Sequence, residues 1–212
     1  MDEKVQKKVE MLDTNPVLYF FVYWGYRITT SVLWRLKRIN VNIVPKTGKV
    51  IIAANHRTFL DPPLIGSTLP RWTYFLAKEE LFRMPILSWA LPRLNTIPLK
   101  RGSTDVEWFK TCVDLLEKGD SLVMFPEGGR HKGEGFGKAR SGVGMIACHA
   151  NAPVIPAYLK NSEYLGKFKK LTIIFGDPVM PNPPQDESKR KEYYQEFSEL
   201  IMTKIAELST KV

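Results

Sequence analysis

A histidine and an aspartate five positions apart could form a general base in this sequence. An apolar run over residues 50–54 precedes them, and His56 and Asp61 follow it closely. Five residues along a helix end about 140° away from the start, so the two side chains can meet only across a turn. The two prolines after Asp61 favour a helix that begins there. The carboxylate could then accept the Nδ1 proton of His56 and leave Nε2 free to take a proton.

The pair by itself also allows a structural interpretation, in which His56 is a hydrogen-bonded histidine at a strand end and Asp61 caps a helix. Charged residues follow two other apolar runs, however, at residues 95–99 and 121–125. Arginines there could bind a phosphate group in bidentate fashion, and glycines would let the backbone approach a ligand closely. Each arginine taken singly could equally be a solvated surface charge. The residues concerned are Lys100, Arg101, Glu127, Gly128, Gly129 and Arg130.

These groups share a site only if the apolar runs are strands of one sheet. Short apolar runs alternate with helical patterns along the chain, which predicts an α/β domain with a mostly parallel central sheet flanked by helices. The carboxyl ends of parallel strands then meet at one edge, where functional groups collect. We predict strands over residues 41–44, 50–54, 72–77, 95–99, 121–125, 154–159 and 171–175, and helices over 16–38, 104–118, 141–149 and 188–208, with a broken helix over 79–94.

Composition narrows the class of protein. The chain has 212 residues, of which 44% are hydrophobic and 25% charged, as in one globular domain with a small appended segment. A formal charge of +9 favours anionic partners, namely nucleic acid, a membrane surface or a phosphorylated substrate. The two cysteines and three histidines lack the spacing of a disulfide framework or a metal site, so we expect no metal.

The N-terminal residues 1–40 carry a separate pattern. Residues 1–12 predict a short amphipathic helix, and Asn15 followed by Pro16 would begin a second one. Its first eleven residues, 16–26, are nearly all apolar or aromatic, which is about half the length that spans a bilayer. Aromatic and basic residues mix there, as in helices that lie in the membrane interface; the alternative is a helix packed on the core through its apolar stripe. We assign 1–40 as a two-helix membrane-anchoring segment and 41–212 as the α/β domain.

Four ordered motifs between residues 50 and 160 resemble those of the glycerolipid acyltransferases. Lys78 lies in a segment, 77–82, that is similar to the one after the first motif of that family, and it is a further candidate near the substrate. The chain departs from the family pattern at Gly129 and His131, where threonine and serine are usual. A later Lys-Gly element of the family is matched only loosely by residues 137–142, so Lys138 and Arg140 are not assigned to the site. The motifs are Asn55-His56-x4-Asp61, residues 97–102, residues 125–130, and Val154-Ile155-Pro156.

The resemblance implies transfer of a fatty acyl group to the sn-2 hydroxyl of lysophosphatidic acid, which gives phosphatidic acid. The donor would be a thioester of acyl carrier protein or coenzyme A, with no other cofactor. His56 would be the general base and Asp61 its orienting carboxylate, while Arg101 and Arg130 would bind the acceptor phosphate. Glu127 would bind a glycerol hydroxyl or hold its loop.

The partners implied are lysophosphatidic acid, the acyl thioester and an anionic membrane surface, with peripheral attachment at the cytoplasmic face of the inner membrane. Two alternatives remain at this point. The same chemistry could act on another acceptor, such as glycerol 3-phosphate or another lysophospholipid. A basic nucleic-acid-binding protein is less favoured, because the aromatic residues gather in one apolar helix instead of alternating with a basic groove.

Overall fold

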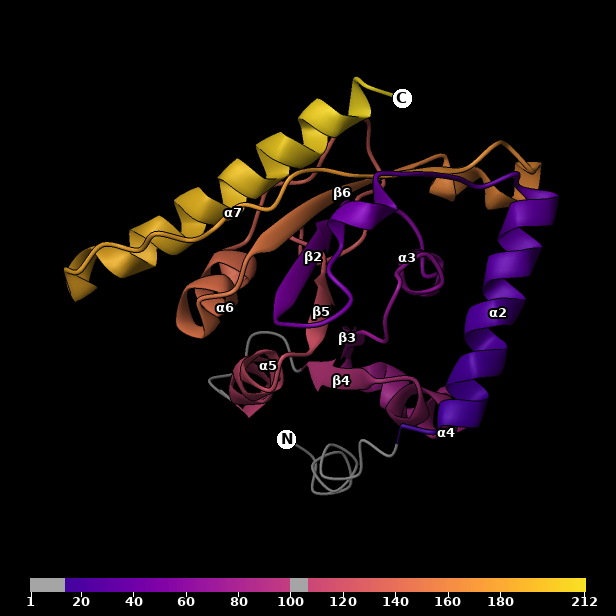
Figure 1. Cartoon of the computed structure of the whole chain (residues 1–212), viewed down its shortest axis with the longest axis horizontal. Coiled ribbons are helices and arrows are strands. Elements are labelled where there is room, and N and C mark those ends of the chain that lie inside the picture. Colours follow the sequence, from indigo (N-terminus) through magenta and orange to yellow (C-terminus); the bar gives the residue numbers. More distant parts are fainter. Residues whose placement is uncertain (1–13, 100–106) are drawn as a thin grey trace.

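A seven-stranded sheet forms the centre of the molecule in the computed structural model, which describes residues 14–99 and 107–212 (Figure 1). The strand order is β1-β7-β6-β2-β5-β3-β4, and every neighbouring pair is parallel except β6 with β7. The predicted α/β class with a mostly parallel sheet is therefore confirmed. The strands are β1 (Lys37–Ile39), β2 (Val50–Ala54), β3 (Tyr74–Lys78), β4 (Thr96–Leu99), β5 (Ser121–Met124), β6 (Val154–Lys160) and β7 (Thr172–Phe175).

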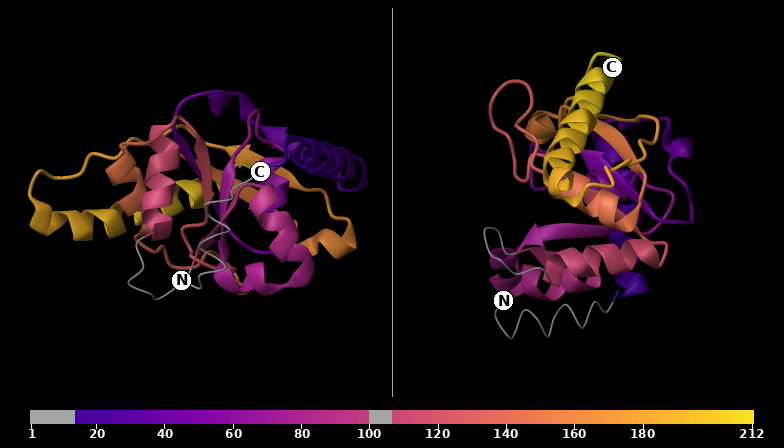
Figure 2. Two further views of the ribbon diagram at one scale, coloured as in Figure 1. Left: turned by 90° about the horizontal axis from the view of Figure 1, so that it is seen from below. Right: turned by 90° about the vertical axis from the view of Figure 1, so that its left-hand side faces the viewer.

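Helices cover both faces of this sheet. The long C-terminal helix α7 packs beside α6, and α2 stands on the opposite side of the molecule, as both ribbon views show (Figures 1 and 2). The described helices are α2 (Pro16–Leu33), α3 (Asp61–Gly66), α4 (Pro85–Arg93), α5 (Glu107–Glu117), α6 (Gly142–Ala150) and α7 (Glu187–Ser209), with short 3-10 segments η1 (Val41–Ile43), η2 (Glu79–Arg83) and η3 (Ser162–Lys167).

Strand β2 is buried on both faces, as its continuous apolar run predicts. Ile51 and Ala53 pack into the core that α5, α6 and α7 complete, while Ile52 and Ala54 pack into the core on the α3 side. Successive side chains of a strand point to opposite faces, so a central strand between two helical layers needs no polar position. The strand that precedes His56 is thereby fixed from both sides.

Helix α2 begins as predicted but ends earlier. The Asn15 side chain accepts a hydrogen bond from the Leu18 N–H at 2.9 Å, so Asn15 caps the helix. The predicted end near residue 38 is wrong, because the helix stops at Leu33 and residues 37–39 join the sheet as β1. Arg35 adopts a left-handed conformation with φ of 48°, which turns the chain so that Leu36 becomes buried. The sheet therefore takes up the last residues of the segment that we assigned to the anchor.

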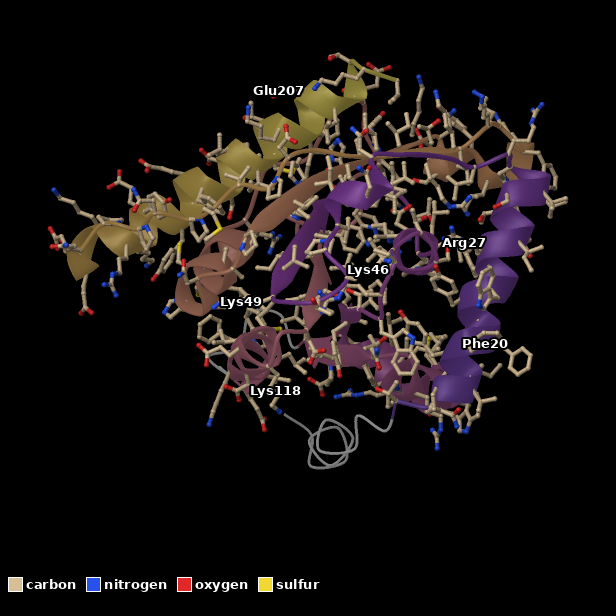
Figure 3. The ribbon with its side chains drawn as sticks, in the orientation of Figure 1. Phe20, Arg27, Lys46, Lys49, Lys118 and Glu207 are labelled. Carbon is tan, nitrogen blue, oxygen red and sulfur yellow. The ribbon has the colours of Figure 1, made fainter. Side chains whose placement is uncertain are left out.

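The apolar stripe of α2 is not packed on the core. Instead, the polar groups of Tyr19, Tyr23 and Arg27 attach the helix to the fold; Arg27 points from α2 towards α3 and donates to the Ser67 carbonyl at 2.9 Å (Figure 3). Within the described residues, no helix is both long enough and apolar enough to cross a bilayer. The large side chains of α2 that are exposed are Val17, Phe20, Phe21, Trp24, Ile28, Val32 and Leu33.

The structure differs from the predicted elements at one further place and does not describe two others. The strand predicted over residues 41–44 is wrong: Asn40 adopts a left-handed conformation and the chain turns into the 3-10 segment η1. Pro98 lies in β4 at the end of the sheet, an edge position that tolerates a proline within a strand. The predicted helix over residues 1–12 and the candidate residues Lys100 and Arg101 lie outside the described residues.

Candidate active site

The turn between β2 and α3 brings His56 and Asp61 together. His56 Nδ1 lies 2.8 Å from Asp61 Oδ2, and the same oxygen accepts hydrogen bonds from the backbone N–H groups of Arg57 (2.6 Å) and Thr58 (2.7 Å). Asp61 is fully buried in the first turn of α3. Three hydrogen bonds to this one oxygen fix the position of the carboxylate. The predicted meeting of the pair across a turn is confirmed.

The imidazole of His56 is held in place but remains reachable. Its ring stacks on Phe125 with the ring centroids 4.0 Å apart, and 15% of the side chain is exposed. Nε2 has no hydrogen-bond partner among the described residues. With Nδ1 directed to Asp61, the free nitrogen is the one that can act as a base.

Glu127 ties the loop after β5 to the histidine turn. It is buried, and its two carboxylate oxygens accept from the backbone N–H groups of His56 (3.3 Å) and Gly137 (3.2 Å). Burial raises the pKa of this carboxyl above its ordinary value of 4.5, against the lowering effect of those two hydrogen bonds. Of the two roles open from the sequence, the contacts of Glu127 in the structure are those of a group that holds the loop.

Arg130 lies over the same turn. Its guanidinium carbon is 3.5 Å from the centroid of the Phe59 ring, a short cation–π contact, and both side chains are exposed. Gly128 has a φ of 64°, which strains any residue with a side chain, and a Cβ there would lie 2.5 Å from Arg140 Cδ, so the Arg140 side chain would have to move. The loop thus places Arg130 on the Phe59 ring of the histidine turn and packs a second arginine, Arg140, against its glycine.

The other residues that the sequence predicts for the site make fewer contacts with the histidine turn or lie outside the described residues. Lys78 ends β3 at the same edge of the sheet and is exposed, and it makes no hydrogen bond or ion pair with the histidine turn among the described residues. Gly129 lies in the loop between Gly128 and Arg130 and is half-buried. Lys100 and Arg101 fall in the undescribed segment 100–106, so their place in the site stays a prediction.

Sequence reasoning missed three residues that organise the site. The Arg57 guanidinium donates to the carbonyls of His131 (3.2 Å), Gly133 (2.6 Å) and Gly135 (2.7 Å) and so fixes the loop over residues 131–135. Phe125 and Arg140 are the other two. Position next to the histidine was the only available signal for Arg57, and no sequence pattern distinguishes a ring that will stack on an imidazole.

An apolar cavity adjoins the site. It has a volume of about 200 Å³ and lies between α2, α3 and η3. Its wall includes Leu60, which directly precedes Asp61, and Leu64 of the same short helix. A cavity that holds no charged side chain and presents mainly apolar surface suits a hydrocarbon chain. The full lining is Gly25, Tyr26, Thr29, Thr30, Trp34, Leu60, Leu64 and Leu165.

Comparisons with known proteins agree with this geometry. A family model described as Acyltransferase matches residues 35–160. Two proteins named 1-acyl-sn-glycerol-3-phosphate acyltransferase are similar over most of their length: that of Helicobacter pylori is 30% identical over 82% of this chain and 81% of its own, and that of Bacillus subtilis is 25% identical over 92% and 98%. A chloroplastic 1-acyl-sn-glycerol-3-phosphate acyltransferase of Brassica napus is 34% identical over 56% of this chain; the match spans only 35% of that protein.

One solved structure shares the fold. The crystal structure of the 1-acyl-sn-glycerophosphate acyltransferase PlsC from Thermotoga maritima matches with a TM-score of 0.66 over 96% of this chain and 83% of its own, at 23% identity.

Proposed function

The chain belongs to the acyltransferase family, and we propose that it transfers a fatty acyl group from an acyl thioester to the sn-2 hydroxyl of lysophosphatidic acid, giving phosphatidic acid. The observation that carries this proposal is the His56–Asp61 pair, with Nε2 of His56 free at the edge of the sheet. The names of relatives that align over most of both chains support the choice of acceptor.

The residues of the site can perform this reaction in two proton transfers. Nε2 of His56 takes the proton of the acceptor hydroxyl as its oxygen attacks the thioester carbonyl, and Asp61 stabilises the imidazolium that forms. The tetrahedral intermediate then collapses, the carbon–sulfur bond breaks, and the imidazolium returns the proton to the departing thiolate. A new ester and a free thiol result, and the base is regenerated.

The acceptor needs a site for its phosphate and its chain. We assign the phosphate to Arg130, with Arg101 and Lys100 as further predicted partners and Lys78 as a candidate near the substrate. The backbone at Gly129 would allow close approach of the headgroup, whereas the Arg140 side chain fills the space beside Gly128. The apolar cavity beside α3 would take a segment of hydrocarbon chain.

Delivery of a lipid acceptor requires contact with a membrane. We propose that α2 lies in the membrane interface as a peripheral anchor at the cytoplasmic face of the inner membrane. Its exposed aliphatic and aromatic side chains support this, as do cations close to its end, Arg35 and Lys37. Phe59 and Leu60, exposed in the histidine turn, add apolar surface at the site itself.

A second acceptor is favoured by one observation. A lyso-ornithine lipid O-acyltransferase of Pseudomonas aeruginosa is 31% identical over 49% of this chain. Its name indicates acyl transfer to a lyso-ornithine lipid. The same machinery could therefore accept another lysolipid.

The test is an assay of the purified protein with acyl-coenzyme A or acyl carrier protein thioester and a set of acceptors. We expect phosphatidic acid from lysophosphatidic acid at a rate that exceeds the rates with glycerol 3-phosphate and lyso-ornithine lipid. Faster acylation of either of the other acceptors would refute the assigned substrate. Loss of no more than a factor of two in the His56→Ala variant would refute the assigned base.

A further inference from the structure

A lysine-lined pocket lies outside the site described above. Its volume is about 310 Å³. Asn161, Thr172 and Val212 complete its wall, and no Asp or Glu of the described residues is part of it. Positive charges therefore converge from segments far apart in the sequence without an acidic side chain between them. The lysines are Lys37, Lys160, Lys170 and Lys211.

This pocket opens at the edge of the sheet that carries the base. Strand β6 runs parallel to β2, with Ala157 level with Ala54, and Lys160 is its last residue. Thr172 of β7 pairs with Lys160, and Lys37 of β1 pairs with Thr172. The carboxyl end of β6 and the beginnings of β7 and β1 thus form one rim, continuous with the end of β2.

A pair of buried hydrogen bonds ties the rim to the histidine. Asn55 Nδ2 donates to the Leu159 carbonyl at 3.0 Å, and Asn55 Oδ1 accepts from the Leu159 N–H at 2.8 Å. Asn55 directly precedes His56, and Leu159 directly precedes Lys160. The base and the rim of the pocket therefore keep a fixed relation to each other.

The charges of the pocket are available to a ligand. Lys160 Nζ donates to the main-chain oxygen of Val212, the last residue of the chain, at 2.7 Å, so this lysine already has a partner. The other three lysines are exposed and take part in no ion pair with a described residue. An ammonium group is a compact charge with three donors, which suits phosphate oxygens. A helix with side chains is about 10–12 Å wide, so a cavity of this size admits a phosphate group and excludes a helix of a protein partner.

We propose that this pocket binds the phosphate of the acyl donor and so directs its thioester towards His56. The inference rests on the proposed function, since it concerns the donor of that reaction. Coenzyme A and acyl carrier protein both join the thioester to a phosphate through the same flexible pantetheine arm, so this phosphate is the chemistry that they share. The apolar surface of α2 suits the lipid acceptor, whereas the polar pocket suits a water-soluble donor.

The test removes three charges from the pocket and leaves Lys160, which has a structural contact. In the variant K37Q/K170Q/K211Q we expect the KM for acyl-coenzyme A to rise at least tenfold. The KM for acyl-pantetheine, which has the thioester but no phosphate, should stay within a factor of two, and so should the KM for lysophosphatidic acid. Acyl carrier protein thioester is measured in parallel, and a rise in its KM alone would also support the proposal.

A matched control removes the same charge at a distance. Lys46 and Lys49 lie in the turn before β2 and Lys118 follows α5, well apart from the end of α7 that Glu207 marks (Figure 3). The variant K46Q/K49Q/K118Q should keep the KM of the parent for every donor. An equal rise in both triple variants would show a general effect of net charge and would overturn the proposal.

Other results would overturn it as well. These are an unchanged KM for both phosphate-bearing donors, an equal rise for acyl-pantetheine, a selective rise for lysophosphatidic acid, or weaker binding to anionic vesicles with donor kinetics unchanged. Calorimetric titration with coenzyme A separates this inference from the proposed function, because it needs no turnover. If the parent protein makes no product, weaker coenzyme A binding in the pocket variant alone would still support the pocket, and equal binding would refute it.

Discussion

Asparagine in place of Asp61 would separate the charge of this carboxylate from its geometry. All three hydrogen bonds go to Oδ2, while Oδ1 is buried without a partner among the described residues. An asparagine can put its oxygen where Oδ2 is and accept the same three bonds. His56 would then keep its orientation and tautomer but lose the negative charge that stabilises its imidazolium form.

The magnitude follows from these contacts. A hydrogen bond to a charged group contributes about 1.5–3 kcal/mol and a neutral one about 1 kcal/mol, so the imidazolium loses roughly 0.5–2 kcal/mol. At about 1.36 kcal/mol per tenfold change, kcat should fall by about 2- to 30-fold. The asparagine NH₂ would replace the buried Oδ1 and find no acceptor, which should lower the free energy of unfolding by about 1–3 kcal/mol.

Alanine at the same position should do more. It removes the orientation of His56 as well as the charge, so kcat should fall by about 10²–10⁴. It also leaves the N–H groups of Arg57 and Thr58 without their acceptor. The assay is initial-rate formation of phosphatidic acid at saturating concentrations of both substrates, with urea unfolding of each variant.

Two results would refute this reasoning. One is a wild-type kcat in Asp61→Asn, which would mean that the charge has no role. The other is a folded Asp61→Asn variant that loses as much rate as Asp61→Ala, which would mean that the asparagine does not keep the geometry. In a His56→Ala background, Asp61→Asn should cause no further loss of rate, because the two residues act as a unit.

Three further predictions concern the rest of the site and the anchor. Arg130→Ala and Arg101→Ala should raise the KM for lysophosphatidic acid at least tenfold while the KM for the donor stays nearly constant, since a charge-assisted phosphate contact is lost; equal effects on both substrates would contradict this. The raised pKa of Glu127 means that the folded state binds the carboxyl proton more tightly than the unfolded state does. This binding stabilises the fold below pH 4.5, and the stabilisation is lost as the pH rises through the folded pKa. The melting temperature of Glu127→Gln should therefore lack this dependence on pH. Replacing the exposed aromatic residues Phe20, Phe21 and Trp24 of α2 with serine should release the protein from anionic vesicles. The fold of this variant and its activity on detergent-dispersed substrate should be preserved. The control variant Leu200→Ser, on α7, should bind vesicles as the parent does.

The chemistry of the pair was readable from the sequence because it depends on neighbours along the chain. An apolar run that both faces of a sheet can bury, a turn of fixed length and prolines that start a helix decide where His56 and Asp61 lie relative to each other. The alternation of strands and helices likewise predicted the mostly parallel sheet. These features are local, so the amino-acid types carry them directly.

Only the tertiary structure decided which groups surround that pair. Phe125 stacks on His56, Arg130 covers Phe59, and Glu127 bridges two loops because β2 and β5 are neighbours in the sheet, which no local pattern states. The same holds for helix α2, whose end depends on the burial of Leu36, a residue that continues the helical stripe in the sequence.

The lysine pocket could not be predicted from the sequence either, because its lysines come from segments far apart in the chain. Lys37 and Lys170 are ordinary surface residues in the sequence, 133 positions apart, and each by itself would be solvated. They meet because β7 runs antiparallel to β6 and parallel to β1, which turns three strand ends into one rim. Strand direction is set by the packing of the whole sheet, whereas the residue types determine only that a strand forms.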